Sequence, residues 1–214
     1  HSLARVAASA DADALASAAA AAPVGAAAAA LQLSPQASLA CAIAPELLHN
    51  ASLVHDDLQD GDAMRRTQPA VWSRFGKDIA ISTGDLLISA AYVALTRHPH
   101  PTDALQAMHD AIAFTIDGQT QDCRTKTPSP ERYEIIAANK SGPLLALPIR
   151  LVLIAADAPG QDTAVQAGHS LAIAYQTLDD IDDRSADLRM TRPTSACHWK
   201  LWGTLRSQPK LSQL

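Results

Sequence analysis

Aromatic residues, glycine and cysteine are all scarce in this chain of 214 residues, with aromatics at 4 %, 9 glycines and 3 cysteines. Cys41, Cys123 and Cys197 lie far apart and form no C-x-x-C pair. The sequence therefore indicates neither a disulfide scaffold nor a zinc site, and we expect a reduced, cytoplasmic protein.

Long, strongly apolar runs are missing too. The most hydrophobic stretch, residues 14–31, is mostly alanine and is interrupted by Pro23 and Gly25. Alanine contributes little to membrane insertion, and a spanning helix needs about 20 strongly apolar residues. No basic segment of the signal-peptide type precedes this stretch. We expect no membrane span and no signal peptide.

Basic residues are outnumbered, with 17 Lys and Arg against 22 Asp and Glu and a formal net charge of −5. This balance argues against a nucleic-acid binder that works through a broad basic surface. It still leaves room for a local anion site, particularly one supplemented by cations.

Alanine is abundant, at about a fifth of the chain, which is well above ordinary usage and favours helix. No alternating strand pattern exceeds a few residues. Proline and glycine divide the chain into helical lengths, and we predict helices over residues 7–22, 26–33, 35–60, 78–96, 102–122, 131–156 and 162–183. The helix at 78–96 is apolar on nearly all sides, so we expect it to be buried. The predicted fold is all-α: a single domain over residues 1–190 and an irregular tail over 191–214.

Two segments have the form Asp-Asp-x-x-Asp, one beginning at Asp56 and the other at Asp179. The first and last aspartates of each share a helix face. Carboxylates this close repel one another and also meet the negative end of the helix dipole. One such cluster is ordinarily a solvated helix end. A second copy, with arginines nearby, favours a function: Mg²⁺ is usually held by one or two carboxylates plus substrate phosphates.

Two basic features accompany the aspartates. The pair Arg65-Arg66 follows the first motif, and guanidinium groups bind phosphate oxygens bidentately. Lys140 lies among apolar residues, so its ammonium has to reach a cavity or a partner, or extend to solvent. Carboxylates, arginines and a lysine together predict a diphosphate site.

The run from Glu46 to Asp57, with Arg65-Arg66 and Pro69 after it, resembles the trans-isoprenyl diphosphate synthase (polyprenyl synthetase) family. Further matches follow in the family's order, over about residues 39–183: Gly84-Asp85, Gly118-Gln119 with Asp122, Lys140-Ser141, and Tyr175-Gln176 before the second aspartate motif. The resemblance implies a helical bundle of the isoprenoid synthase type around a deep central cavity, with both aspartate motifs at its mouth. Members of this family are typically homodimers.

Residue roles carry over from the same resemblance. It implies about three Mg²⁺ per site, with the ligands Asp56, Asp57, Asp60, Asp179, Asp180 and Asp183. It implies contacts to the allylic diphosphate from Arg65, Lys140, Ser141 and Gln176, and to isopentenyl diphosphate from His49 and Arg66. Gln119 and Asp122 would support the metal ligands. The small residues Ala51 and Ser52, before the first motif, would leave room for products of C20 or longer.

The implied activity is a head-to-tail, trans prenyl transfer between isopentenyl diphosphate and an allylic prenyl diphosphate, giving products of C15–C20 or longer. Beyond the metal and diphosphate ligands, it needs no dedicated catalytic side chain. Some positions depart from the family: Trp72 stands where a histidine is usual, and the N-terminal basic element is poorly represented. Alternatives therefore stay open, namely a non-catalytic or regulatory homologue, an enzyme resembling a class I terpene cyclase, and a metal phosphohydrolase using His49, His55, Asp56 and a distal aspartate.

Overall fold

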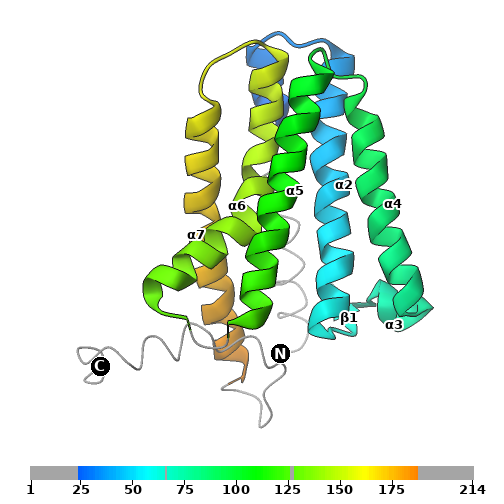
Figure 1. Ribbon diagram of the computed structural model, residues 1–214, viewed down its shortest axis with the longest axis vertical. Coiled ribbons are helices and arrows are strands. Elements are labelled where there is room, and N and C mark those ends of the chain that lie inside the picture. Colours follow the sequence, from blue (N-terminus) through cyan, green and yellow to red (C-terminus); the bar gives the residue numbers. More distant parts are fainter. Residues whose placement is uncertain (1–23, 66, 126–127, 188–214) are drawn as a thin grey trace. The chain divides into compact units, whose positions relative to one another are not determined.

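The computed structural model describes residues 24–65, 67–125 and 128–187, and their side chains up to residue 178. Within this part the chain is almost entirely helical, as predicted (Figure 1). A first helix covers residues 24–30. It includes Gly25, so the expected break at Gly25 is wrong. The predicted helix at 7–22 and the tail at 191–214 lie outside the described residues.

The remaining elements follow the predicted order closely. The helices are α2 (Pro35–Asp60), α3 (Val71–Phe75), α4 (Lys77–Leu95), α5 (Pro101–Arg124), α6 (Pro130–Ala155) and α7 (Gln161–Asp187), and the strands are β1 (Met64–Arg65) and β2 (Gln68–Pro69). The chain forms two compact units. Unit 1 runs up to residue 107 and includes Leu147–Gln161, and unit 2 combines Met108–Ala146 with the chain from Asp162 onward.

Helix α2 begins and ends where the sequence predicts. The Ser34 side chain accepts a hydrogen bond from the Ala37 N–H at 3.2 Å, and Pro35 opens the helix. Gly61 ends it with a left-handed φ of 76° and donates its N–H to the Asp57 carbonyl, a conformation that glycine adopts without strain. These local signals fix the first aspartate motif in the last turn of α2.

In unit 1, α2 packs along α4 (Figure 1). Small side chains are buried on both helices, among them Ala40 and Ala44 of α2 and Ala80 of α4. Gly84 lies against His55: a Cβ there would come within 2.0 Å of the His55 Nε2. The core of the same unit includes fully buried Leu95, Leu147, Leu151, Val152 and Cys41.

A buried histidine joins distant segments of unit 1. His98, after α4, is 4 % exposed, and its Nε2 lies 3.0 Å from the Leu151 carbonyl oxygen of α6. The His98 Nδ1 accepts the His100 N–H at 3.0 Å. Because one nitrogen accepts, the other must donate to the carbonyl, which assigns the neutral Nε2–H tautomer.

The connection after α2 holds more structure than the polar loop that was predicted. β1 and β2 pair antiparallel, with Met64 opposite Pro69 and Arg65 opposite Gln68. Thr67 at the turn has φ 66°, which is an outlier for a β-branched residue. The short helix α3 follows and packs against α4 and α2.

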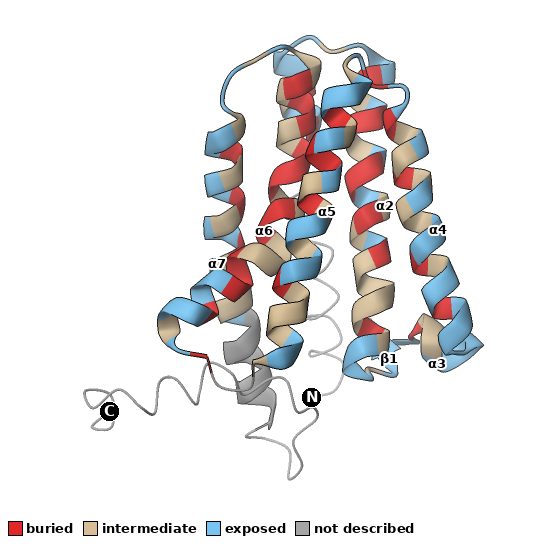
Figure 2. Cartoon of the chain, in the orientation of Figure 1, coloured by how far each residue is buried: buried red, intermediate tan, exposed pale blue. Residues whose placement is uncertain are grey.

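Helix α4 is not buried as the sequence predicted. Its buried residues are Ala80, Gly84, Ala91 and Leu95. Ile79, Leu86 and Val93 are 52 %, 69 % and 65 % exposed, and Figure 2 shows exposed bands along this helix. The prediction failed because a helix that is apolar all round does not reveal which of its faces has a neighbour.

Unit 2 is built on close contacts between helices. A Cβ at Gly118 of α5 would lie 2.3 Å from the Lys140 backbone nitrogen of α6. A Cβ at Gly142 of α6 would lie 2.6 Å from the His169 ring, and one at Gly168 of α7 would lie 2.6 Å from the Gly142 carbonyl oxygen. The absence of side chains at these positions lets the helices cross.

Three described helices, α2, α4 and α6, are long and apolar enough to cross a membrane by length and composition alone. Inside the fold, 44 %, 22 % and 50 % of their most apolar windows are buried. The expectation of no membrane span stays a prediction.

Candidate functional site

The first aspartate motif occupies the end of α2, and its three carboxylates differ in exposure. Asp56 is partly exposed and Asp60 is exposed, whereas Asp57 is 3 % exposed. Asp56 and Asp60 are four residues apart and share one helix face, and Asp57 is turned about 100° from Asp56. Three residues of one type thus occupy different environments.

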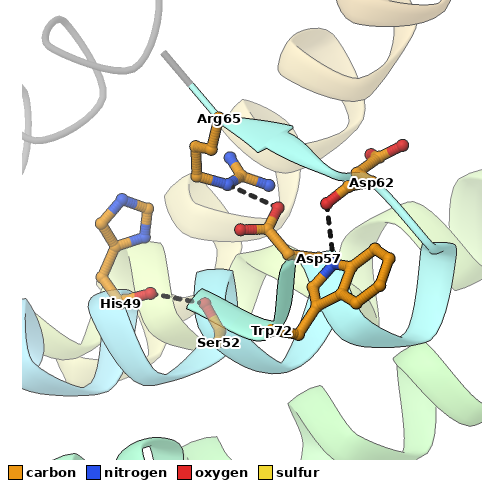
Figure 3. Close-up of polar contacts among 6 residues, drawn as sticks. All are labelled: His49, Ser52, Asp57, Asp62, Arg65 and Trp72. Carbon is orange, nitrogen blue, oxygen red and sulfur yellow. Dashed lines mark hydrogen bonds and ion pairs between the residues drawn. The ribbon is translucent and has the colours of Figure 1, made fainter. Parts of the chain in front are cut away.

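Asp57 is paired with Arg65 of β1. The Arg65 Nε donates to the Asp57 Oδ1 at 2.7 Å, and the two side chains are 30 % and 4 % exposed (Figure 3). Burial raises the pKa of the Asp57 carboxyl above its usual range, and the hydrogen bond and charge of Arg65 offset only part of this effect. The free-energy cost of burying the Asp57 carboxylate is therefore larger than the stabilisation that Arg65 provides.

The residues around this pair brace the connection that carries Arg65. The Trp72 Nε1 donates to the Asp62 carbonyl at 2.8 Å (Figure 3). The Ala70 N–H donates to the Ala63 carbonyl at 2.9 Å and closes the hairpin. Trp72, which departs from the family's usual histidine, thus ties α3 to the residue that follows α2.

His49 lies two turns before the aspartates, and its ring projects from the same side of α2 as Arg65 (Figure 3). The Ser52 hydroxyl donates to the His49 carbonyl at 2.8 Å. Ala51 is buried at 2 % exposure. The hydroxyl of Ser52 is thus satisfied within its own helix.

In unit 2, Lys140 is paired with a carboxylate. Its Nζ lies 3.0 Å from the Asp122 Oδ2, with side chains 20 % and 21 % exposed. The pair joins α5 and α6 one turn beyond Gly118, where the two backbones touch. Gln119 donates to the Cys123 Sγ at 3.8 Å. Lys140 therefore has a partner on α5 and does not simply extend to solvent.

Helix α7 carries the second motif. Gln176 is partly exposed on this helix. Asp179, Asp180 and Asp183 lie on its helical backbone, and their side chains are outside the described residues. Arg66 is also outside them.

The donor set at the end of α2 fits a magnesium ion. The described residues contain no group of three or more His, Cys, Asp and Glu side chains that could hold a metal ion by themselves. Mg²⁺ does not require such a cage, because one or two carboxylates suffice when substrate phosphates and water fill the other positions. Asp56 and Asp60, on one face of α2, are carboxylates of this kind.

The chain is similar to known proteins over most of its length. The sequence profile described as polyprenyl synthetase matches residues 19–193. The chain belongs to the polyprenyl synthetase family. It is 34 % identical over 155 residues to the (2E,6E)-farnesyl diphosphate synthase of Mycobacterium tuberculosis, covering 69 % of this chain and 43 % of that relative. It is 36 % identical over 147 residues to the geranylgeranyl diphosphate synthase of the same organism, covering 64 % of this chain and 42 % of the relative.

Solved structures of the polyprenyl synthetase family share the fold. The polyprenyl synthetase from Streptomyces coelicolor matches with a TM-score of 0.66 at 32 % identity, over 84 % of this chain and 54 % of that one. This confirms the predicted isoprenoid synthase fold. The chain spans about half the length, or less, of these three relatives.

The structure brings together some of the predicted site residues. Within unit 1 it places Arg65 on Asp57, and within unit 2 it places Lys140 on Asp122. The roles of the predicted metal and diphosphate ligands remain predictions. Ser141 is partly exposed and precedes Gly142, where α7 crosses α6.

The glycines that bring the helices together had no predicted role. Gly84, Gly118, Gly142 and Gly168 all lie inside helices and all face a neighbouring element. A glycine inside a helix costs about 1 kcal/mol relative to alanine, so four of them within predicted helices indicate close packing. Two of them, Gly118 and Gly142, flank Lys140-Ser141 and so help to position it.

Proposed function

We propose that this protein is a magnesium-dependent prenyltransferase that joins isopentenyl diphosphate to an allylic prenyl diphosphate, head to tail and in the trans configuration. Its products would be C15–C20 or longer. One observation carries the proposal: in a chain of the polyprenyl synthetase family, carboxylates at the end of α2 stand next to an arginine that Asp57 holds at 2.7 Å.

The aspartates would act as metal ligands, not as acids or bases. Asp56 and Asp60 of α2 fit this role, and we propose the same role for the α7 aspartates Asp179, Asp180 and Asp183. Bound Mg²⁺ would neutralise charge on the departing diphosphate. Asp57 belongs to the same motif, and its carboxylate accepts a hydrogen bond from Arg65.

The basic residues would bind the diphosphate groups. Arg65 presents a planar guanidinium that suits phosphate oxygens, and Lys140 supplies a compact charge. Groups that are held in place before reaction stabilise developing charge without reorganising, and the Asp57 and Asp122 carboxylates would hold these cations in this way. Ser141 and Gln176 would complete the allylic side, with Gln119 supporting the metal ligands.

The second substrate would be held by His49 and Arg66, which keeps its double bond close to the allylic carbon. Once the allylic carbon–oxygen bond breaks, the double bond attacks the allylic cation, and a proton is then lost to the released diphosphate. Small side chains at Ala51 and Ser52 would leave room for a growing chain. We further propose a homodimer in the cytoplasm.

Product analysis tests this proposal. The protein is incubated with Mg²⁺, isopentenyl diphosphate and a C5, C10 or C15 allylic diphosphate, and the products are identified by mass spectrometry. Elongated prenyl diphosphates are expected, and none should form when either substrate is left out. A hydrocarbon or alcohol from the allylic diphosphate alone would instead indicate a cyclase-like enzyme, and no turnover at all would indicate a non-catalytic homologue.

A further inference from the structure

We propose that residues 194–214 of this chain pack against the outer face of its own helix α7. The outer face consists of Ala167, Leu171, Ala174 and Leu178. This contact lies within one chain, and it does not depend on the proposed function.

The outer face of α7 is apolar and exposed. Leu171 and Leu178 are 51 % and 63 % exposed, and Ala167 and Ala174 are exposed as well. Spacings of four, three and four residues place all four on one side of the helix. Exposed apolar residues that occur singly are ordinary, whereas several in register indicate a surface that another segment covers.

A different face of α7 makes the contacts within unit 2. An added Cβ at Gly168 would lie 2.6 Å from the Gly142 carbonyl oxygen of α6, and Ala172 is 0 % exposed. Gly168 and Ala172 each follow an outer-face residue by one position, which turns them about 100° away from it. Figure 2 shows buried and exposed bands side by side along α7. The packing of unit 2 therefore leaves the outer face open.

The chain that follows α7 has the composition to cover this face. Helix α7 ends at Asp187, and the match to the polyprenyl synthetase profile ends at residue 193. Residues 194–214, which lie outside the described part, contain Trp199 and Trp202, two of the three tryptophans, and four leucines. Tryptophan removes a large apolar area from water when it packs. Because the segment lies beyond the family match, the contact would be a property of this chain.

Charge favours the same pairing. The segment carries Lys200, Arg206 and Lys210 and contains no Asp or Glu. Asp182 follows Leu178 by four residues on the helical backbone of α7, so it extends the outer face by one turn. Asp182 is also the one aspartate of residues 179–183 that is not among the predicted metal ligands. A basic segment lying along the outer face would meet an opposite charge at one end.

The length of the chain permits the contact. The helix from Leu178 to Asp187 is about 14 Å long, and the outer face from Ala167 to Leu178 extends for about 17 Å. Residues 188–193 can span up to about 20 Å when extended, so the chain can turn back past the end of α7. A segment tethered this closely has an effective concentration of about millimolar, which favours even a weak contact.

The test uses the full chain and the double variant Leu171→Lys/Leu178→Lys, with Leu39→Lys as the matched control. Leu39 is 55 % exposed on α2, in unit 1. Tryptophan emission and its quenching by acrylamide are measured. The double variant should shift the emission to longer wavelength and increase the quenching constant, and Leu39→Lys should leave both unchanged. Trp72 contributes equally to all three proteins, because its indole is held by the Asp62 carbonyl in unit 1.

A second variant, Trp199→Ala/Trp202→Ala, gives the reciprocal measurement and keeps the test valid if the lysine variant does not fold. Its changes lie outside the family match. Hydrogen exchange over residues 167–178 should become several-fold faster than in the parent chain, because the outer face loses its cover. Exchange over residues 35–60 of α2 should stay unchanged.

Four results would overturn the inference. The first two are equal quenching in the parent and the lysine variant, and unchanged exchange over residues 167–178 in the tryptophan variant. The third is tryptophan shielding that disappears when the protein is diluted, which would assign the outer face to a second copy. The fourth is shielding that arises only when phospholipid vesicles are added, which would assign the segment to a membrane surface. Elongation is not measured, so a chain without prenyltransferase activity would contradict only the proposed function.

Discussion

The backbone nitrogen of Lys140 lies where a side chain on Gly118 would stand, at 2.3 Å from an added Cβ. Both residues belong to unit 2, and the contact sets how close α5 comes to α6 at the Lys140–Asp122 pair. Gly118, although unfavourable for helix formation, therefore lets α5 and α6 approach closely enough for Lys140 to pair with Asp122.

Gly118→Ala tests this contact. The methyl group would force the two backbones apart, and we expect a loss of about 1–3 kcal/mol in the free energy of unfolding, measured by urea denaturation. Gly25→Ala is the matched control, because nothing lies within 4 Å of its added Cβ and alanine favours helix by up to about 1 kcal/mol. Equal effects of the two substitutions would contradict the packing role of Gly118.

Thr67 occupies a backbone conformation that suits it poorly, with φ 66°. Asparagine tolerates the left-handed region better than a β-branched residue does. We expect Thr67→Asn to raise the free energy of unfolding by about 0.5–1 kcal/mol. A lower stability of this variant in thermal or urea denaturation would show that the threonine side chain contributes more than its backbone strain costs.

His98 should matter for stability although it lies in a connection between helices. His98→Ala would leave the Leu151 carbonyl and the His100 N–H without the partner that each has now. An unsatisfied buried polar group costs about 1–3 kcal/mol. The exposed His109 provides the control, and His109→Ala should change the free energy of unfolding by less than about 0.5 kcal/mol. Similar losses of stability in both variants would contradict a stabilising role for the two His98 hydrogen bonds.

The cysteines should differ in reactivity towards iodoacetamide. Cys41 is 0 % exposed, and burial raises its pKa to about 11, whereas Cys123 is exposed. The thiolate is the reactive form. In the native protein at about pH 8, Cys123 should be modified and Cys41 protected, as peptide mass spectrometry can measure; modification of both at one rate would contradict the burial of Cys41.

The raised pKa of Cys41 also affects stability at alkaline pH. From the unfolded value of 9.0 up to about 11, the native thiol keeps a proton that the unfolded chain loses. The free energy of unfolding contributed by this group therefore falls as pH rises through that range. Cys41→Ala should reduce the slope of this fall in denaturation experiments.

The helices could be predicted from sequence because their signals are local. Ser34, Pro35 and Gly61 mark α2 by capping chemistry that needs no tertiary context. The hairpin was missed because two-residue strands carry no periodicity. The exposed face of α4 was not predicted, because the composition of a helix does not show which of its faces packs against another element.

The candidate site was predictable as a set of residues and not as an arrangement. Asp56, Asp57 and Asp60 are alike in the sequence, and only the fold turns Asp57 inward onto Arg65. Likewise, Lys140 and Asp122 were predicted for separate tasks and pair with each other in the structure. Such pairings depend on how helices and hairpins cross, which spacing along the chain does not encode.

The most direct test of the central claim, that the protein is a prenyltransferase with the aspartates of α2 and α7 as its metal ligands, is the elongation rate of Asp56→Ala and Asp179→Ala as Mg²⁺ is raised. We expect each variant to lose at least about a hundred-fold in turnover while its circular dichroism spectrum stays that of the parent, with Asp62→Ala as the control that keeps activity. Near-parental turnover in either aspartate variant would contradict the account.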